Sequence, residues 1–254
     1  MRVQACFWSA LVLLAGCATV APRPETAPFA PARHGDFDHD TLALTWQPGF
    51  CSTSEGCEAD QPHAPLIGLH GLWASEPHAL EGQGVPVQEW WRKGCPLLED
   101  APDAAPVLEP PVAEKLSAVV PHTAQPLVPH EWNKHAACFG YAATPFFAKA
   151  LALRDRFAQS APGLWLVAHQ GRVVSHEAMI ASFEASTFGS VGARPVERAL
   201  QTQCRYDRKG RVVLTQIWFT LSPKHLDDFP AAASYVSSPE AQDNCPAQFL
   251  IPHW

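Results

Sequence analysis

Two short segments of the sequence carry side chains that could transfer protons. The first, residues 66–73 (LIGLHGLW), is an apolar run that contains two glycines and one histidine, His70. A lone histidine in an apolar strand is usually a hydrogen-bonded core residue, so it is informative only together with the second segment. That segment, residues 129–138 (PHEWNKHAAC), holds four ionisable side chains close together: His130, Glu131, Lys134 and His135.

The second segment is expected to be helical, and a helix places its ionisable side chains on one side. Positions 130, 134, 131 and 135 lie at roughly 0°, 40°, 100° and 140° around a helix axis. An apolar core would not accept four ionisable groups, and a solvated helix face has no need of two histidines. We therefore interpret the segment as part of a site whose pKa values are shifted by neighbouring charges.

A zinc site is the competing interpretation of this helix, and the spacing argues against it. Zinc proteases use H-E-x-x-H, in which both histidines lie on one helix face. Here Lys134 stands where the second histidine is required, and His135 lies about 140° around the axis from His130. A cation between the histidines would repel zinc, and the sequence contains no C-x-x-C pair. We therefore expect neither a metal nor another cofactor.

Mixed α and β elements must position these two segments. Alternating or β-branched runs predict strands at residues 41–47, 66–73 and 211–222. Apolar periodicity and proline punctuation predict helices at residues 111–120, 129–139, 144–159 and 176–188. No internal repeat or linker to a second domain is visible. The expected fold class is α+β, with a single domain over residues 37–254.

Composition restricts the compartment and the partners of the protein. The chain has 254 residues, 47% of them hydrophobic, and a formal net charge of −7. This length suits one domain, and the acidic balance excludes a protein that coats nucleic acid through a broad basic surface. Eight cysteines, two methionines and 25 prolines indicate export to an oxidising compartment.

The N-terminus has the pattern of a secretory signal. Residues 1–17 combine one positive charge with an apolar run that is too short to remain as a membrane-spanning helix. The run ends in Leu-Ala-Gly-Cys, which resembles a bacterial lipoprotein cleavage site, so we expect Cys17 to be acylated. An ordinary cleaved signal is the alternative. Ala18 then implies the outer membrane, and residues 18–36, rich in alanine and proline, are expected to form a tether.

This signal predicts a periplasmic protein that is tethered to the outer membrane by its lipid, or otherwise a soluble periplasmic or secreted one. Six cysteines remain in the body of the chain once Cys6 and Cys17 are set aside. They are Cys51, Cys57, Cys95, Cys138, Cys204 and Cys245. An even number in an exported chain indicates three disulfides, for which the sequence alone allows fifteen pairings.

LIGLHGLW and HEWNKHAAC together resemble the two active-site segments of the ribonuclease T2 family of secreted endoribonucleases. The two blocks occur in the family's order after TWQPGFC, and KHAACFG and TQCRYDRKGRVVLTQIWFTL are similar to the bacterial periplasmic ribonuclease I branch. The resemblance covers roughly residues 40–250. It implies a central, mainly antiparallel sheet packed by helices, and it implies the disulfides Cys51–Cys57, Cys95–Cys138 and Cys204–Cys245.

The resemblance also implies a role for each ionisable residue of the two segments. His135 would act as the base and His70 as the acid in transesterification, with exchanged roles when the cyclic phosphate is hydrolysed. Lys134 would stabilise charge on the phosphoryl oxygens. Glu131 would either orient a neighbour or donate a proton, and His130 would contact phosphate.

Trp73, at the end of the first block, would either stack on a base or only pack against the sheet. Three positions depart from the family pattern: Ala74 replaces a proline, Ala136-Ala137 replace Gly-Ser/Thr, and Leu127-Val128 replace aromatic residues that stack a base. The first two changes keep small residues in place. The third changes the expected base site.

RNA carries its own nucleophile, the 2′-hydroxyl beside the phosphorus, so two histidines and a lysine can cleave it without a metal. We predict an endoribonuclease that cleaves single-stranded RNA through a 2′,3′-cyclic phosphate with low base specificity. It is expected to be a monomer, to leave DNA intact, and to contact the membrane only through its lipid anchor. The alternative is a catalytically inactive surface lipoprotein that uses the fold as a binding module.

Overall fold

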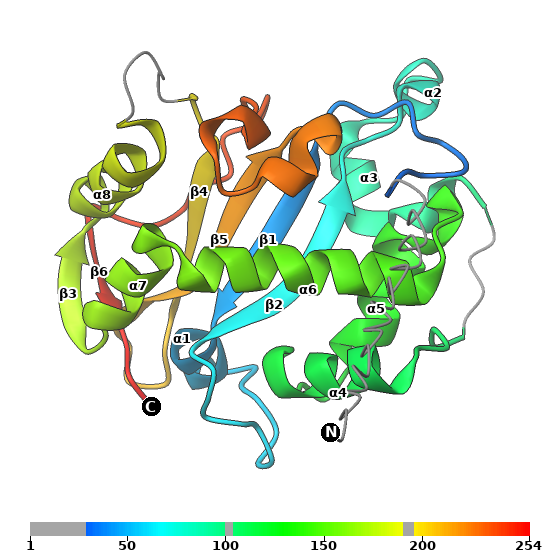
Figure 1. The fold of residues 1–254 in the computed structure, drawn as a ribbon. Helices are drawn as coiled ribbons and strands as arrows, with labels where there is room; N and C mark the ends of the chain where they lie inside the picture. The colour runs from blue at the N-terminus through cyan, green and yellow to red at the C-terminus, as the bar shows by residue number, and fades with distance from the viewer. Residues whose placement is uncertain (1–28, 100–103, 190–195) are drawn as a thin grey trace, which may run out of the picture.

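A six-stranded sheet forms the centre of the computed structural model, which describes residues 29–99, 104–189 and 196–254 (Figure 1). The strands are β1 (Asp40–Trp46), β2 (Ile67–Ala74), β3 (Arg172–Ser175), β4 (Leu200–Tyr206), β5 (Val212–Leu221) and β6 (Gln248–Ile251). The order across the sheet is β2-β1-β5-β6-β3, and β4 also pairs with β5. All pairings are antiparallel except a short parallel contact between β5 and β6, which confirms the predicted α+β class and the mainly antiparallel sheet.

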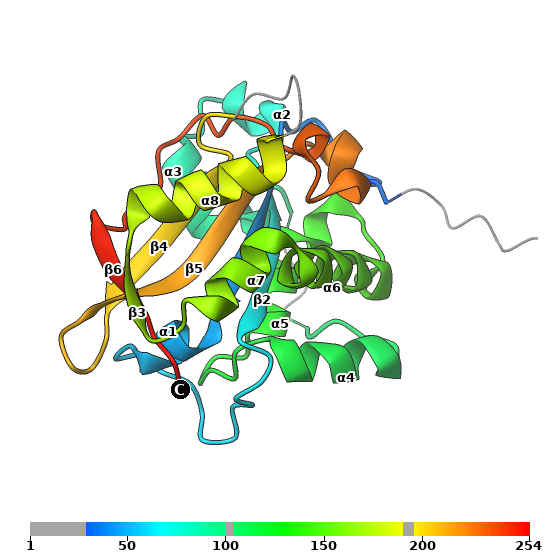
Figure 2. The ribbon, with the colours of Figure 1, turned by 60° about the vertical axis from the view of Figure 1, so that its left-hand side comes forward.

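Helices cover one face of this sheet and its β2 edge. The helices are α1 (Gln47–Ser52), α2 (His78–Glu81), α3 (Val87–Lys93), α4 (Pro110–Val119), α5 (Leu127–His135), α6 (Ala143–Gln159), α7 (Ala161–Ala168) and α8 (His176–Phe188). Short 3-10 helices are η1 (Cys95–Leu97), η2 (Ala137–Phe139), η3 (Pro223–Asp228) and η4 (Ala232–Ser234). The helices α6, α7 and α8 form a layer on one face, whereas α4 and α5 lie beside β2 (Figures 1 and 2).

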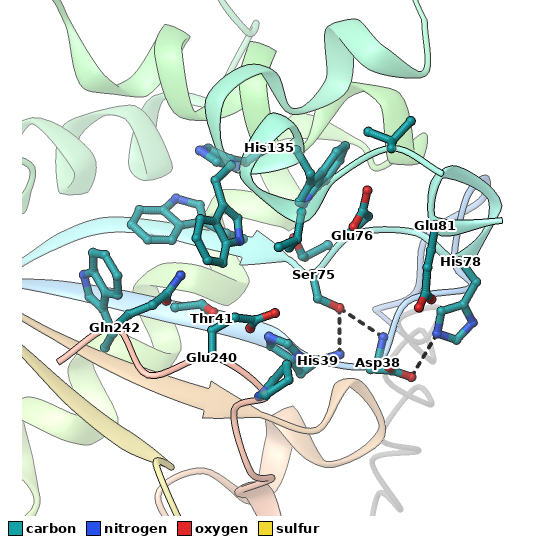
Figure 3. Close-up of a pocket in the computed structure, with 18 of the residues that line it drawn as sticks. Asp38, His39, Thr41, Ser75, Glu76, His78, Glu81, His135, Glu240 and Gln242 are labelled. Atoms are coloured by element: carbon teal, nitrogen blue, oxygen red, sulfur yellow. Dashed lines mark hydrogen bonds and ion pairs between the residues drawn. The ribbon is translucent and has the colours of Figure 1, made fainter. Parts of the chain in front are cut away.

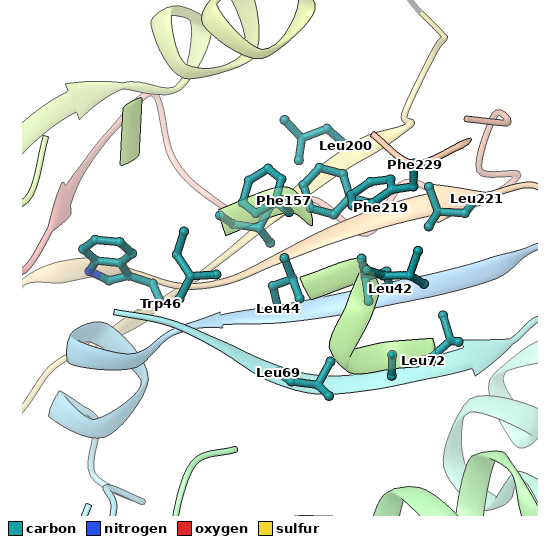
Figure 4. Close-up of a cluster of buried hydrophobic side chains, with 14 of the residues drawn as sticks. Leu42, Leu44, Trp46, Leu69, Leu72, Phe157, Leu200, Phe219, Leu221 and Phe229 are labelled. Atoms are coloured by element: carbon teal, nitrogen blue, oxygen red, sulfur yellow. The ribbon is translucent and has the colours of Figure 1, made fainter. Parts of the chain in front are cut away.

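The main core lies between the sheet and α6. Alternate residues of β1, Leu42 and Leu44, are fully buried there, and Phe157 of α6 packs against Phe219 of β5 with ring centroids 4.8 Å apart (Figure 4). Because successive side chains of a strand point to opposite faces, the neighbours of Phe219 on β5 point away from α6. Trp218 therefore lies on the face of the sheet opposite to α6.

The helix α5, which carries the four ionisable side chains, is shorter than the sequence predicts. It begins directly after Pro126 and tolerates Pro129 in its first turn, where backbone N–H groups have no partner inside the helix. It ends at His135 because Ala136 has φ −133°, and a 3-10 turn follows at η2. The predicted helix over residues 129–139 is therefore wrong in its last part. The chain therefore does not continue as one helix from α5 into η2.

The three disulfides join Cys51 to Cys57, Cys95 to Cys138, and Cys204 to Cys245. These are the pairs that the family resemblance implies, so this prediction is confirmed. The second bridge links η1, which follows α3, to η2, which follows α5. It fixes the segment that follows the ionisable helix.

The end of the expected tether contacts the domain. Phe29 stacks on Tyr141 with ring centroids 4.8 Å apart, and the backbone N–H groups of Ala32 and Arg33 donate to the carbonyl of Phe139 at 2.9 and 3.0 Å. The signal segment with Cys17, and residues 18–28 of the tether, lie outside the described residues. Among the helices that the structure describes, none is long and apolar enough to cross a membrane.

Candidate active site

The strand β2 and the helix α5 bring the two predicted segments together. His70 Nε2 lies 3.4 Å from Glu131 Oε1, and the ring of His135 lies 6.4 Å from that of His130. The Trp73 ring lies between the histidines, 5.3 Å from His70 and 5.2 Å from His135 by centroids. Every site residue that the sequence predicts outside the cysteines is thus part of one cluster.

A β-bulge aims His70 into the cluster. In the pairing of β1 with β2, Ala43 lies opposite Gly71 and Leu44 lies opposite Leu69, so His70 is an extra residue without a partner. Residues three apart on a regular strand point to opposite faces, yet the rings of His70 and Trp73 contact each other. The bulge turns one strand residue toward the other, as bulges beside active sites do.

Gly71 allows the close approach of α5 to β2. A Cβ atom at this position would collide with Glu131 Oε2 and with the indole nitrogen of Trp73. The carboxylate therefore occupies the space that a side chain would take. Glu131 is only 2% exposed in this position.

Both oxygens of the Glu131 carboxylate have a charged or hydrogen-bonding partner. The indole N–H of Trp73 donates to Oε2, and Oε1 faces the His70 ring. Burial alone would raise the pKa of Glu131, but the charge and hydrogen bond of His70, the charge of His135 and the Trp73 hydrogen bond hold this pKa well below its ordinary value. Glu131 is therefore a buried, ionised carboxylate.

His70 is held from its other side by β5. Its Nδ1 donates to Gln216 Oε1 at 2.7 Å, and the Trp218 indole N–H donates to the same oxygen at 3.0 Å. Burial alone would lower the pKa of His70. The Glu131 charge and the hydrogen bonds to Glu131 and Gln216 together raise it by more, so the net pKa lies above its ordinary value. His70 is therefore stabilised in its protonated form.

His135 has the opposite electrostatic environment. Burial lowers its pKa, and the charges of Lys134, His130 and His70 lower it further against the opposing effect of Glu131. The resulting pKa is about 3. His70 and His135 are therefore in opposite protonation states between the lowered pKa of His135 and the raised pKa of His70.

Two pockets adjoin the cluster, one bordered by His135 and the other by His70. A pocket of about 510 Å³ is lined by Lys134 and His135, by residues at the start of β1, and by Pro239, Glu240 and Gln242 (Figure 3). Four tryptophans also line it: Trp73, Trp90, Trp91 and Trp218. We call it the His135 pocket. A second pocket of about 450 Å³, the His70 pocket, is lined by His70, Phe50, Gln216, Leu127 and Arg205 among others. The cluster thus separates two cavities, each of a size suited to a nucleotide.

One group of residues could ligate a metal ion, but its surroundings disfavour a cation. Among the described residues, His130, Glu131 and His135 offer ligand atoms within 4.8 Å of one another. Both oxygens of Glu131, however, already face His70 and the Trp73 indole. The adjacent ammonium of Lys134 adds a positive charge that disfavours a cation.

Two residues of this site were not identified from the sequence: Gln216 and Trp218. They lie on the predicted strand 211–222, and their spacing of two places them on the same face of that strand. A single amide side chain among apolar strand residues was the available signal. The sequence alone does not tell which distant side chain that amide contacts.

Comparison with known proteins agrees with this geometry. Residues 37–229 match the family model of the ribonuclease T2 family. Ribonuclease I of Escherichia coli K12 is 27% identical over 271 aligned residues, which cover 96% of this chain and 97% of that protein. A ribonuclease of Aeromonas hydrophila is 27% identical over 147 residues, or 58% of each chain.

Solved structures show the same fold. RNase NT, determined in complex with 5′-AMP, has a TM-score of 0.58 at 17% identity and covers 85% of this chain and 98% of its own. The self-incompatibility associated SF11-RNase of Nicotiana alata has a TM-score of 0.58 at 19% identity and covers 85% of this chain and 100% of its own. The chain belongs to the ribonuclease T2 family. It is an endoribonuclease of this type, and RNA is its substrate.

The substitution Glu131→Gln tests the electrostatic coupling in this site. We expect it to lower the pKa of His70, because burial then acts on the imidazolium without an opposing negative charge. NMR titration of the His70 imidazole nitrogens measures this pKa. Glu89→Gln on α3 is the matched control, since Glu89 pairs with Arg92 and Lys93 rather than with the site. An unchanged His70 pKa in Glu131→Gln would show that the carboxylate does not set the charge of His70.

Proposed function

We propose that the enzyme cleaves single-stranded RNA by metal-independent transesterification through a 2′,3′-cyclic phosphate, with low base specificity. The observation that carries this proposal is the placement of His70 and His135 against the same Trp73 ring, and the raised pKa of His70 and lowered pKa of His135 support it. General acid–base catalysis requires one protonated and one neutral group at the start of the reaction. His70 and His135 border two separate pockets, and Lys134 lines the pocket of His135, which supports this assignment.

In the first half-reaction, His135 accepts the proton of the 2′-hydroxyl while O2′ bonds to phosphorus. The P–O5′ bond breaks, and His70 delivers its proton to O5′. The His70 Nε2 proton is available because 3.4 Å to Glu131 is longer than a typical charge-assisted hydrogen bond. In the second half-reaction water adds to phosphorus, the P–O2′ bond breaks, His70 accepts a proton from water and His135 returns one to O2′.

Lys134 and His130 supply positive and polar contacts for the phosphoryl group in this mechanism. Lys134 lines the His135 pocket, and its positive charge acts on His135. A charge placed where the phosphorane develops stabilises the transition state more than the bound substrate. His130 is exposed beside His135, where it can contact a phosphate oxygen.

Glu131 and Trp73 are proposed as positioning residues. The low pKa of Glu131 supports orientation of His70 and stabilisation of its charge rather than donation of a proton. Trp73 holds Glu131 through its indole N–H and presents its ring face to His135. Of the two roles left open for Trp73, packing within the site is thus supported directly, while its partly exposed edge also borders the His135 pocket.

The proposed roles of the two histidines determine which side of the scissile bond each pocket binds. The base His135 must lie beside the attacking 2′-hydroxyl, so its pocket takes the nucleoside on the 5′ side of the scissile bond. The acid His70 must lie beside O5′, so its pocket takes the nucleoside on the 3′ side. Four tryptophans line the first pocket, and stacking on tryptophan tolerates any base. This supports cleavage with low base specificity.

The pH dependence of cleavage follows from the same two groups. Activity requires neutral His135, which holds above its lowered pKa of about 3, and protonated His70, which holds below its raised pKa. We expect a bell-shaped kcat/KM that is high in mildly acidic solution and declines above the ordinary histidine pKa of about 6.5. Dinucleotide cleavage measured from about pH 3 to about pH 9 checks this. A rate that is flat or still rising at the alkaline end contradicts the assignment.

The chemistry of the products separates this mechanism from metal-dependent hydrolysis. We expect cleavage to persist in excess chelator, to yield a 2′,3′-cyclic phosphate first, and to fail on DNA or on RNA with a 2′-O-methyl group at the scissile nucleotide. His70→Ala and His135→Ala should each lower the rate by roughly 10²–10⁴-fold. Oligonucleotide cleavage followed by mass spectrometry measures these outcomes.

His225→Ala is the matched control for the histidine variants, because this exposed histidine of η3 pairs with Asp228 outside the site. Efficient cleavage of DNA, or complete loss of activity with chelator, would overturn the mechanism. RNA binding without any cleavage would favour the alternative of an inactive binding module.

We also propose that residues 1–17 are removed as a lipoprotein signal and that Cys17, acylated, anchors the protein to the periplasmic side of the outer membrane through residues 18–36. The sequence Leu-Ala-Gly-Cys before Ala18 supports this. The protein is expected in the membrane fraction, and Cys17→Ser should release it into the soluble fraction or block processing. A wild-type protein that is already soluble after signal cleavage would exclude the anchor.

A further inference from the structure

A group of cations lies at the turn between β4 and β5. Residues 205–211 read Arg-Tyr-Asp-Arg-Lys-Gly-Arg, in a chain whose net charge is −7. The four cationic side chains are all exposed, and we call them the hairpin cluster: Arg205, Arg208, Lys209 and Arg211. Such a local excess of positive charge on an acidic protein indicates a surface for a polyanion.

The hairpin cluster is continuous with the His70 pocket. Arg205 lines this pocket together with Gln216, the residue that holds His70. On the paired strands, Gln203 lies opposite Gln216, and Arg205 follows in the direction of the turn. A strand of RNA that leaves the His70 pocket past Arg205 therefore meets the turn next.

The turn is fixed to the end of α1 rather than projecting freely. The side chain of Asp207, 2% exposed, accepts hydrogen bonds from the backbone N–H groups of Lys209 and Arg211, both at 2.9 Å. Asp207 also forms a β-bridge with Thr53, and the Arg208 N–H donates to the carbonyl of Ser52 at 3.0 Å. The backbone that carries the cations is thus rigidly placed.

The side chain of Arg208 lies against the rim of the same pocket. Gly56, which lines the His70 pocket, has φ +65°, and a Cβ atom there would collide with the Arg208 guanidinium. The Cys51–Cys57 disulfide closes the loop that contains this glycine. The guanidinium therefore lies directly beside the exit of the pocket.

Two of the four cations have no ion-pair partner within the described part of the chain: Arg208 and Lys209. Arg205 pairs with Glu55 at 3.2 Å, but both side chains are more than half exposed, and such pairs contribute little. A phosphate can therefore bind Arg208 and Lys209 without first breaking a buried interaction.

We propose that the hairpin cluster extends the RNA-binding site and binds phosphates on the 3′ side of the scissile bond. The inference rests on the proposed function, in which the His70 pocket takes the nucleoside on that side. Contacts to phosphates carry no base preference, so this extension would lengthen the bound RNA without adding sequence specificity. It gives an acidic enzyme a local means of holding a polyanion.

The test uses oligonucleotides with one ribonucleotide in a deoxynucleotide chain, so that a single bond is cleavable. One substrate has a single nucleotide on the 3′ side, a second is extended on the 3′ side, and a third is extended on the 5′ side. We expect Arg208→Glu with Lys209→Glu to lower kcat/KM for the 3′-extended substrate on the order of tenfold at low salt. The slope of log kcat/KM against log salt should also become shallower by about 1.4, or about 0.7 for each lost contact.

Lys224→Glu is the matched control, because it also reverses an exposed lysine but lies in η3, after the end of β5 that is opposite to the turn. With this variant, the ratio of kcat/KM for the 3′-extended substrate to that for the shortest substrate should be the same as with the wild-type enzyme. Arg208→Ala with Lys209→Ala should show a smaller loss of the same kind. Cleavage of the shortest substrate at the wild-type rate shows that the variants are folded.

Equal losses on the 5′-extended and 3′-extended substrates, or no loss on either, would overturn the hairpin assignment. Failure of the proposed function has a different result, since the wild-type enzyme would then not cleave even the shortest substrate to a cyclic phosphate. The two failures are therefore distinguishable in one experiment.

Discussion

The buried carboxylate of Glu131 is the interaction on which the active site depends. A charged group that is 2% exposed is stable only if its partners replace the water that it has lost, and here the His70 ring and the Trp73 indole do so. The same carboxylate keeps His70 protonated. The packing of α5 on β2 and the charge of His70 therefore both depend on one side chain, and Gly71 is the residue that leaves room for it.

The parts of this structure that were predictable from the sequence are those that depend on local pattern. The strand expected at residues 211–222 is β5, and the helices expected at 144–159 and 176–188 are α6 and α8 within one residue. The ionisable face of the second segment was predictable because it needs only the geometry of one helix. Short elements such as β3 and β6, each four residues, carry too little periodicity to be recognised.

The remaining features depend on contacts between distant segments. The bulge at His70 exists only in the register of β2 against β1, and the hydrogen bond from His70 to Gln216 joins positions 146 residues apart. By residue type His70 and His135 are equivalent. Burial lowers the pKa of both, but His70 has hydrogen bonds to Glu131 and Gln216 that oppose burial, whereas the charges of Lys134, His130 and His70 add to burial at His135.

The bridge between Cys95 and Cys138 couples oxidation to the assembly of the site. Gly94 approaches the backbone carbonyl of Lys134, so the segment around Cys95 packs directly on α5. When α5 packs against this segment, it holds the two thiols close and raises their effective concentration. By linkage, the closed bridge stabilises the packed position of α5 by the same free energy. A bridge of this kind typically contributes about 2–5 kcal/mol. A reduced chain lacks this contribution, so the packing of α5 against the segment around Cys95 is less stable in it.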